Sequence, residues 1–120
     1  MVELDQFKYR ISGYDAQIEN IKQSLDLDSK KKRIEELEAL GFWDDPDKSN
    51  KAMKELKTLK DSFEGYNSLK SGLEDINTLI EMADEMQDDS LISEIEDEIT
   101  VFEEKMDSIR TETLLSGEYD

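Results

Sequence analysis

The side chains whose spacing most suggests chemistry lie in the acidic stretch DDPDKSN, which matches the start of a calcium-binding loop. Asp45, Asp47 and Ser49 stand at the first three ligand positions of such a loop. The loop also needs Gly at its sixth position and Glu at its twelfth, and here these residues are Asn50 and Leu56. We therefore expect no calcium site.

Other chemistry is limited by the residue types that the sequence lacks. The chain has 120 residues with no Cys and no His, which excludes disulfides, the commonest zinc sites and His-dependent acid–base catalysis. The pairs Asp84–Glu85 and Asp88–Asp89 suit a loosely held Mg²⁺, but carboxylates at helix ends more often cap the helix or stay solvated. No glycine-rich phosphate loop or G-x-S-x-G motif occurs. We predict no catalytic, cofactor-binding or metal-binding residue and no enzymatic activity.

Charge is distributed unequally along the chain, whose formal net charge is −17. Residues 1–60 carry 13 acids and 12 bases, whereas residues 61–120 carry 19 acids and only three bases. The second half should be repelled by nucleic-acid phosphates, so a basic protein surface is its more plausible partner. The alternative is that the acids only keep long helices soluble and monomeric.

Composition favours helices in a soluble protein. The hydrophobic fraction is 36% and the charged fraction 39%, as is typical of long amphipathic helices, and there is one Pro. No apolar run approaches the ~18 residues of a membrane span. The N-terminus lacks the basic and apolar regions of a secretion signal, so we expect no membrane contact and a cytoplasmic location.

Four helices are predicted, and the first covers residues 4–25 without a break. Its apolar side chains alternate at steps of three and four, which indicates an a/d seam of three heptads. Gly13 beside the seam weakens the helix by about 1 kcal/mol relative to Ala. The pattern does not decide whether the seam packs within its own chain or across a dimer. The seam residues are Leu4, Phe7, Ile11, Tyr14, Ile18, Ile21 and Leu25.

The second predicted helix is short and ends at Gly41, a residue that suits the position after a helix C-terminus. Three residues of types that favour the N-cap position precede it. Its basic run, Lys30–Arg33, should form a solvated face that pairs with the glutamates that follow, although contact with RNA is an alternative. The cap candidates are Asp26, Asp28 and Ser29, the apolar face is Ile34, Leu37 and Leu40, and the glutamates are Glu35, Glu36 and Glu38.

A loop with two large aromatic residues should separate the second and third helices. Phe42 and Trp43 are expected to plug the end of a bundle, and the alternative is an exposed anchor for a partner. Asp45 before Pro46 is a strong helix start, because the carboxylate caps free N–H groups and Pro suits the first helical position.

The third helix is predicted from Pro46 to Met86, about 60 Å at 1.5 Å per residue. Gly65 and Gly72 inside it indicate bends or close backbone approaches. Its apolar face comprises Met53, Leu56, Leu59, Phe63, Tyr66, Leu69, Leu73, Ile76, Ile80 and Ala83.

A turn with Asp88 or Asp89 as the next cap should lead to a fourth helix. Its apolar face is Ile92, Ile95, Ile99, Phe102, Met106 and Ile109. Short connections favour antiparallel neighbours. The expected fold is therefore all-α, an antiparallel helical bundle with a long coiled-coil-like helical hairpin.

Helical periodicity fails after Arg110, and the stretch TETLLS is a weak strand candidate. We expect a helical domain over residues 1–112 and the start of a second, absent domain over residues 113–120.

Four segments in order resemble the N-terminal helical domain of the bacterial peptide chain release factor 2 family. They are LDLDSKKKRIEELEAL, FWDDPDKSNKAMKELKTLK, KSGLEDINTLIEMADE and TLLSGEYD. The FWDD loop (Phe42, Trp43, Asp44 and Asp45) and the terminal SGEYD (Ser116–Asp120) are the most specific, and we interpret these residues as structural. The chain would then be a fragment of a longer factor.

The resemblance implies translation termination on the ribosome. In this family a Ser-Pro-Phe tripeptide reads UAA or UGA, and a Gly-Gly-Gln loop promotes hydrolysis of peptidyl-tRNA; neither tripeptide occurs here. The helical domain is implied to lie near the ribosomal stalk base and to cooperate with release factor 3. We also expect it to be a monomer and to read no nucleic acid directly. The alternatives are an acidic coiled-coil adaptor and a nucleic-acid binder that uses Lys30–Arg33 and Lys48–Lys60.

Overall fold

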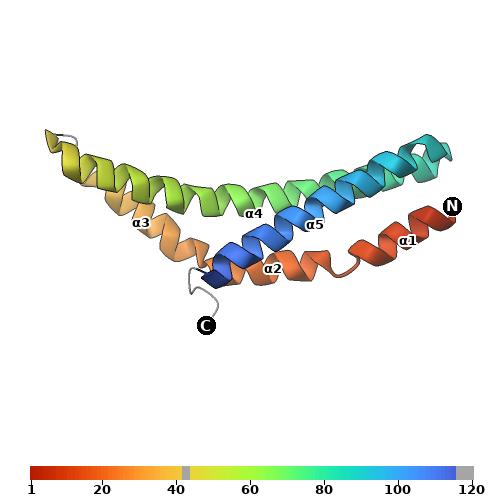
Figure 1. Ribbon diagram of the computed structural model, residues 1–120, viewed down its shortest axis with the longest axis horizontal. Coiled ribbons are helices and arrows are strands. Elements are labelled where there is room, and N and C mark those ends of the chain that lie inside the picture. Colours follow the sequence, from red (N-terminus) through yellow and green to blue (C-terminus); the bar gives the residue numbers. More distant parts are fainter. Residues whose placement is uncertain (42–43, 116–120) are drawn as a thin grey trace.

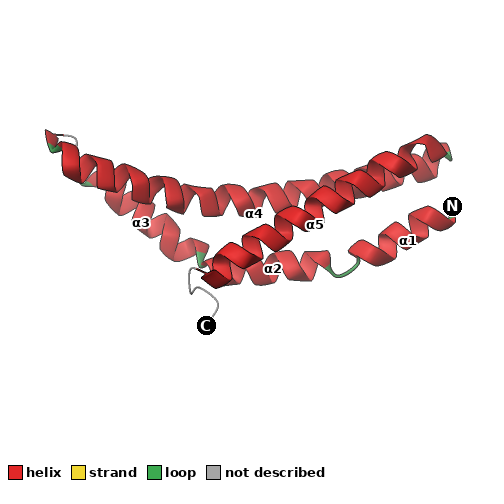
Figure 2. Ribbon diagram, in the orientation of Figure 1, coloured by secondary structure: helices red, strands yellow, loops and turns green. Residues whose placement is uncertain are grey.

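The computed structural model describes residues 1–41 and 44–115, and the regular structure there is entirely helical, which confirms the all-α prediction (Figures 1 and 2). The molecule is elongated, with a longest dimension of 60 Å. The helices are α1 (Val2–Ile11), α2 (Tyr14–Leu25), α3 (Leu27–Ala39), α4 (Pro46–Met86), the short 3₁₀ helix η2 (Asp89–Leu91) and α5 (Ile92–Leu115).

Helix α4 is the axis of the fold and has the predicted bounds. Asp45 caps it as expected, because its carboxylate accepts hydrogen bonds from the amides of Asp47 and Lys48 at 3.1 and 3.3 Å. Gly41 before the loop has a φ of +63°, the left-handed conformation expected after a helix. At the far end Asp88, one of the two predicted caps, accepts from the amide of Ser90 at 2.9 Å.

The helices pack along α4 in two groups (Figure 1). Helix α3 lies against the first part of α4, and α1, α2 and α5 lie against the remainder. A small apolar cluster of Leu37, Ala52 and Leu56 joins α3 to α4. The large core forms where α4 and α5 pair as an antiparallel hairpin and α1 and α2 cover it.

Two glycines let α5 approach α4 closely. A Cβ at Gly72 would lie 3.3 Å from Cδ2 of Phe102, and one at Gly65 would lie 3.3 Å from Cδ1 of Ile109. The prediction of close backbone approach at these positions is therefore confirmed. The ring of Phe102 and the branched side chain of Ile109 occupy the space that a Cβ atom would fill at Gly72 and at Gly65.

The prediction of one unbroken helix over residues 4–25 is wrong. Helix α1 ends at Ile11 and α2 begins at Tyr14, with Ser12 and Gly13 in a turn between them. The amide of Ser12 donates to the carbonyl of Tyr9, three residues back, and the Ser12 hydroxyl donates to the same carbonyl. These local bonds and the flexible Gly13 interrupt the helix, yet six of the seven seam side chains are buried and Tyr14 is half-buried.

The expectation that short connections reverse the chain is wrong at the junction of α2 and α3, and the break between α1 and α2 does not reverse the chain either (Figure 1). Helices α1, α2 and α3 follow one another in one general direction, and only the turns after α3 and α4 reverse it (Figure 1). Asp26 alone separates α2 from α3 in a left-handed conformation, with φ +50° and ψ +60°. One such residue redirects the helix axis without a loop. Asp26 stands at the N-cap position of α3, as one of the three predicted candidates, but its side chain makes no cap hydrogen bond. Asp28 and Ser29, the other two candidates, lie inside α3, so for them the prediction is wrong.

Three further sequence predictions differ from the structure. Met53 and Leu40 are 56% and 51% exposed, although both were expected on buried faces. Leu40 is the C-cap residue, just after the last residue of α3. Residues 111–115 are helical, so the strand predicted there is wrong. Thr113 is 2% exposed, so burial of this side chain accompanies the continuation of the helix past Arg110, and its hydroxyl is satisfied within the helix by donating to the carbonyl of Ile109 at 2.8 Å. The proposed boundary at residues 112 and 113 stays a prediction.

Candidate functional site

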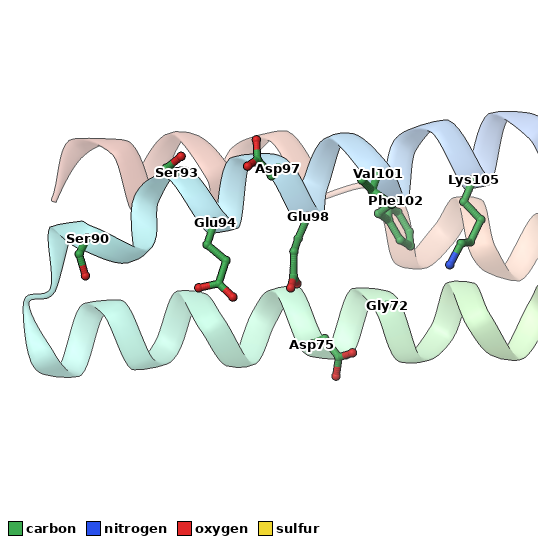
Figure 3. Close-up of a pocket in the computed structure, with 10 residues that line it drawn as sticks. All are labelled: Gly72, Asp75, Ser90, Ser93, Glu94, Asp97, Glu98, Val101, Phe102 and Lys105. Carbon is green, nitrogen blue, oxygen red and sulfur yellow. The ribbon is translucent and has the colours of Figure 1, made fainter.

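The acidic groove between α4 and α5 is the candidate functional site (Figure 3). It has a volume of about 640 Å³. Its rim carries four acids from two helices, Asp75, Glu94, Asp97 and Glu98, and its apolar part is formed by Val101 and Phe102.

Helix geometry places these acids. Glu94 and Glu98 are four residues apart and so lie on one side of α5, from which both point toward α4, whereas Asp97 points away from α4 (Figure 3). Residues of α5 three and four apart on the opposite side face the core, as Ile95 and Ile99 do. Because the apolar side of α5 faces the core, the acids of α5 gather on the solvent-exposed side of the hairpin.

One cation limits the groove at its far end. The ammonium group of Lys105 donates a hydrogen bond to the hydroxyl of Ser68 on α4, at 2.7 Å. Val101 beside it is 57% exposed, so the groove offers an apolar contact between negative and positive groups. This combination suits a basic protein surface with apolar side chains better than it suits a phosphate backbone.

A second polar cluster, which the sequence analysis missed, joins three helices. Arg10 of α1 donates to both carboxylate oxygens of Glu103 on α5, from Nε at 3.0 Å and from Nη2 at 2.6 Å. The hydroxyl of Tyr14 on α2 donates to the same carboxylate. The Nη1 atom of Arg10 lies 3.6 Å from Glu96. No sequence signal identifies this cluster, because Glu103 is separated from its partners by about 90 residues.

The pKa values of this cluster shift in the directions that the contacts require. Hydrogen bonds from Arg10 lower the pKa of Glu103, against the opposing effect of partial burial, and the bond from Tyr14 lowers it further. Burial raises the pKa of Tyr14, and the bond to Glu103 raises it again. The carboxylate is thus held ionised, as a structural contact rather than as an acid or base.

The two ends of the basic run Lys30–Arg33 contact α4, where the ammonium of Lys30 donates to the hydroxyl of Ser62 at 3.0 Å, whereas Lys31 and Lys32 are exposed, as predicted for a solvated face. Arg33 donates to both oxygens of Glu55, at 2.6 and 3.0 Å, and lies 3.3 Å from Glu36, as the sequence predicted. Across the same interface Lys60 lies 3.5 Å from Glu38. These ion pairs neutralise part of the charge that a nucleic-acid binder would need.

The acids of the calcium-like stretch belong to the start of α4. Asp45 is the cap of α4 and Asp47 lies in its first turn. No group of three or more acids in residues 1–41 and 44–115 is arranged to hold a metal ion. Asp44 is exposed. Phe42, Trp43 and Ser116–Asp120 lie outside the described residues, and so does the prediction that the aromatic pair plugs the bundle.

Comparison with known proteins gives the family. The model of the PCRF domain matches residues 9–120. This chain belongs to the PCRF domain family. The match includes the α4–α5 hairpin with its acidic groove and most of the helices that pack on it.

Curated relatives of this PCRF domain are release factors. The chain is 30% identical to "Peptide chain release factor 2" of Staphylococcus saprophyticus and 34% identical to that of Nitratiruptor sp., over 99% and 98% of its length. It is 37% identical to the Clostridium perfringens factor over 81% of its length. The resemblance found in the sequence is therefore confirmed. The chain spans about a third of the length of these relatives. No solved structure matches it.

In the described part of this PCRF domain no helix is long and apolar enough to cross a membrane.

Proposed function

We propose that this PCRF domain is the docking domain of a translation termination factor. In the full-length factor, stop-codon-dependent hydrolysis of peptidyl-tRNA at UAA and UGA would be carried out by parts outside this chain. The single observation that carries the proposal is the family match over residues 9–120 together with the release factor 2 relatives. The chain itself would position the factor in the cytoplasm on the ribosome and would not catalyse hydrolysis.

The acidic groove is the part of the domain that we propose makes the contact. A basic protein surface at the ribosomal stalk base is the expected partner, with release factor 3 as a second one. The rim acids and the exposed Val101 support this assignment, because they provide charge complementarity around an apolar centre. The ion pairs of Arg33 with Glu55 and Glu36 support the view that α3 does not read nucleic acid.

The domain is expected to act as a monomer. The seam of residues 4–25 is already buried against α4 and α5 of the same chain, which leaves α1 and α2 without that face for a coiled-coil partner. This arrangement counts against the alternative of an acidic coiled-coil adaptor that dimerises through its first helices.

Binding to purified ribosomes tests the proposed contact. The triple change Glu94→Gln, Asp97→Asn and Glu98→Gln should weaken binding by about tenfold, because it removes the charges that face the basic partner. Sedimentation of labelled chain with ribosomes at 0.1 M salt measures this.

A charge-matched control separates the groove from net charge. Glu3→Gln, Asp5→Asn and Glu19→Gln remove the same charge from exposed positions on α1 and α2, and should change affinity less than about threefold. Equal losses in both variants, or no binding of the wild-type chain, would contradict the groove as the contact.

A further inference from the structure

Helix α1 is joined to the rest of the domain by an exposed break. Ser12 and Gly13 are both exposed, and nothing lies within 4 Å of the position where a Cβ on Gly13 would stand. The hydrogen bonds at the break are local, such as the one from the amide of Gln17 to the carbonyl of Gly13. Neither Ser12 nor Gly13 itself makes a hydrogen bond to another part of the chain that would fix the angle between α1 and α2.

The helix on the N-terminal side of this break is short. Helix α1 has ten residues, fewer than the roughly 12–15 at which an isolated helix becomes stable in water. Its stability must come from docking, in which Leu4, Phe7 and Ile11 are buried against the α4–α5 hairpin. Detachment and unfolding of α1 would then be one event.

Helix α2 has anchors of its own, so it need not follow α1. Arg110 of α5 donates to the side-chain oxygen of Gln17 at 2.6 Å, and the ammonium of Lys22 lies 5.7 Å from the centre of the Tyr66 ring. Its apolar face, Ile18, Ile21 and Leu25, is buried. The two halves of the seam are thus fixed by separate contacts.

The side chain of Glu103 contacts both halves of the seam, α1 and α2. Its carboxylate accepts from Arg10 just before the break and from Tyr14 just after it. In a helix Arg10 and Tyr14 would lie one above the other, and here a residue of α5 holds them at that spacing across the interruption. The Tyr14 ring also stacks on Phe102, with ring centres 5.6 Å apart, which fixes the α2 side.

We propose that α1 detaches from the α4–α5 hairpin as a unit, with Ser12–Gly13 as the hinge and the contact between Arg10 and Glu103 holding the closed form. Detachment uncovers the apolar surface of the hairpin that α1 covers, while α2 stays docked. The domain then has a second, less compact state whose population depends on one charged hydrogen-bonded pair.

Hydrogen exchange in the 120-residue chain tests the hinge. In the wild type, amides of residues 6–11 should exchange at least about 100-fold faster than amides of residues 69–83, with residues 18–25 protected well above α1. Equal protection of α1 and α2, or exchange of α1 only together with α4, would overturn the hinge.

Substitutions test the holding contact. Glu103→Gln and Arg10→Lys should each accelerate exchange in α1 by about tenfold relative to α2, since both lose the two-pronged charged bond, and Arg10→Lys keeps the charge and the partly exposed position. Glu104→Gln, an exposed neighbour, should leave α1 unchanged. Acceleration of α1 and α2 alike, or an equal effect of Glu104→Gln, would overturn the assignment of Glu103.

Discussion

At the scale of single residues, protonation of Glu103 should destabilise the domain. Contacts with Arg10 and Tyr14 hold its pKa below the ordinary value of about 4.3, so its contribution to the free energy of unfolding is present above that value. This contribution is lost as the pH falls through the lowered folded-state pKa. Urea unfolding of the wild type and of Glu103→Gln between pH 6 and pH 3 should show a stability difference that narrows with acid. A difference that stays constant with pH would contradict this account.

The two glycines on α4 should respond differently to Ala, although both Cβ positions lie 3.3 Å from a side chain. Phe102 is buried and stacked on Tyr14, so it has no room to yield to Gly72→Ala. Overpacking should cost about 1–3 kcal/mol there and exceed the gain of about 1 kcal/mol in helix propensity. Ile109 is only partly buried, and the flexible end of its side chain can move aside for Gly65→Ala. Urea unfolding should rank Gly65→Ala above Gly72→Ala by at least about 1 kcal/mol; the reverse order would refute this packing argument.

At the scale of the helices, the start of α4 should depend on one carboxylate. Asp45→Ala removes the acceptor for the amides of Asp47 and Lys48 and should lower the free energy of unfolding by about 1 kcal/mol. Asp44→Ala removes an adjacent exposed acid and serves as the control. Thermal unfolding followed by circular dichroism compares the two variants. Equal stabilities would show that the cap does not hold this end of the helix.

The break between α1 and α2 should tolerate a side chain. Gly13 has φ −98° and ψ 1°, values open to Ala, and a Cβ there would meet nothing within 4 Å. Gly13→Ala should therefore raise the free energy of unfolding by about 0.4–1 kcal/mol, because it restricts the unfolded chain. Chemical denaturation measures the change. Destabilisation would mean that the turn needs a conformation that only glycine adopts.

The sequence predicted elements well where the signal was local. Asp45 and Pro46 predicted the start of α4, and Gly41 predicted the end of the preceding helix. Both predictions succeed because helix caps and glycine conformations depend on adjacent residues. The seam also predicted which side chains of α1 and α2 are buried. It could not reveal the break at Ser12–Gly13, since a heptad pattern records which side faces inward and not whether the backbone bonds continue.

Other features depended on tertiary contacts and could not be predicted. Thr113 is buried, and α5 continues through it to Leu115, although the local sequence resembles a strand. Of the candidate site, the excess of acids in the second half was visible in the sequence. The groove itself was not, because it requires Asp75 on α4 and the acids of α5 to line the same hollow.

At the scale of the whole molecule, the net charge of −17 should make stability rise with salt. The acids of α4 and α5 repel one another across the hairpin, and screening shortens the reach of that repulsion from about 30 Å at 0.01 M to about 8 Å at 0.15 M salt. The melting temperature of the wild type should therefore increase over this range, as differential scanning calorimetry would show. The variant that lacks the charges of Glu94, Asp97 and Glu98 should show a smaller increase. A melting temperature that falls with salt would mean that the favourable ion pairs outweigh the repulsion.

Peptide release by a chimeric factor tests the central claim that this chain is the docking domain of a termination factor. In the chimera, this chain replaces the matching third of the Clostridium perfringens release factor 2, and release is measured on ribosomes programmed with UGA. We predict that the chimera releases peptide, that deletion of the segment lowers kcat/KM, and that this chain alone releases none. Hydrolysis by the chain alone, or full activity of the factor without the segment, would contradict the account.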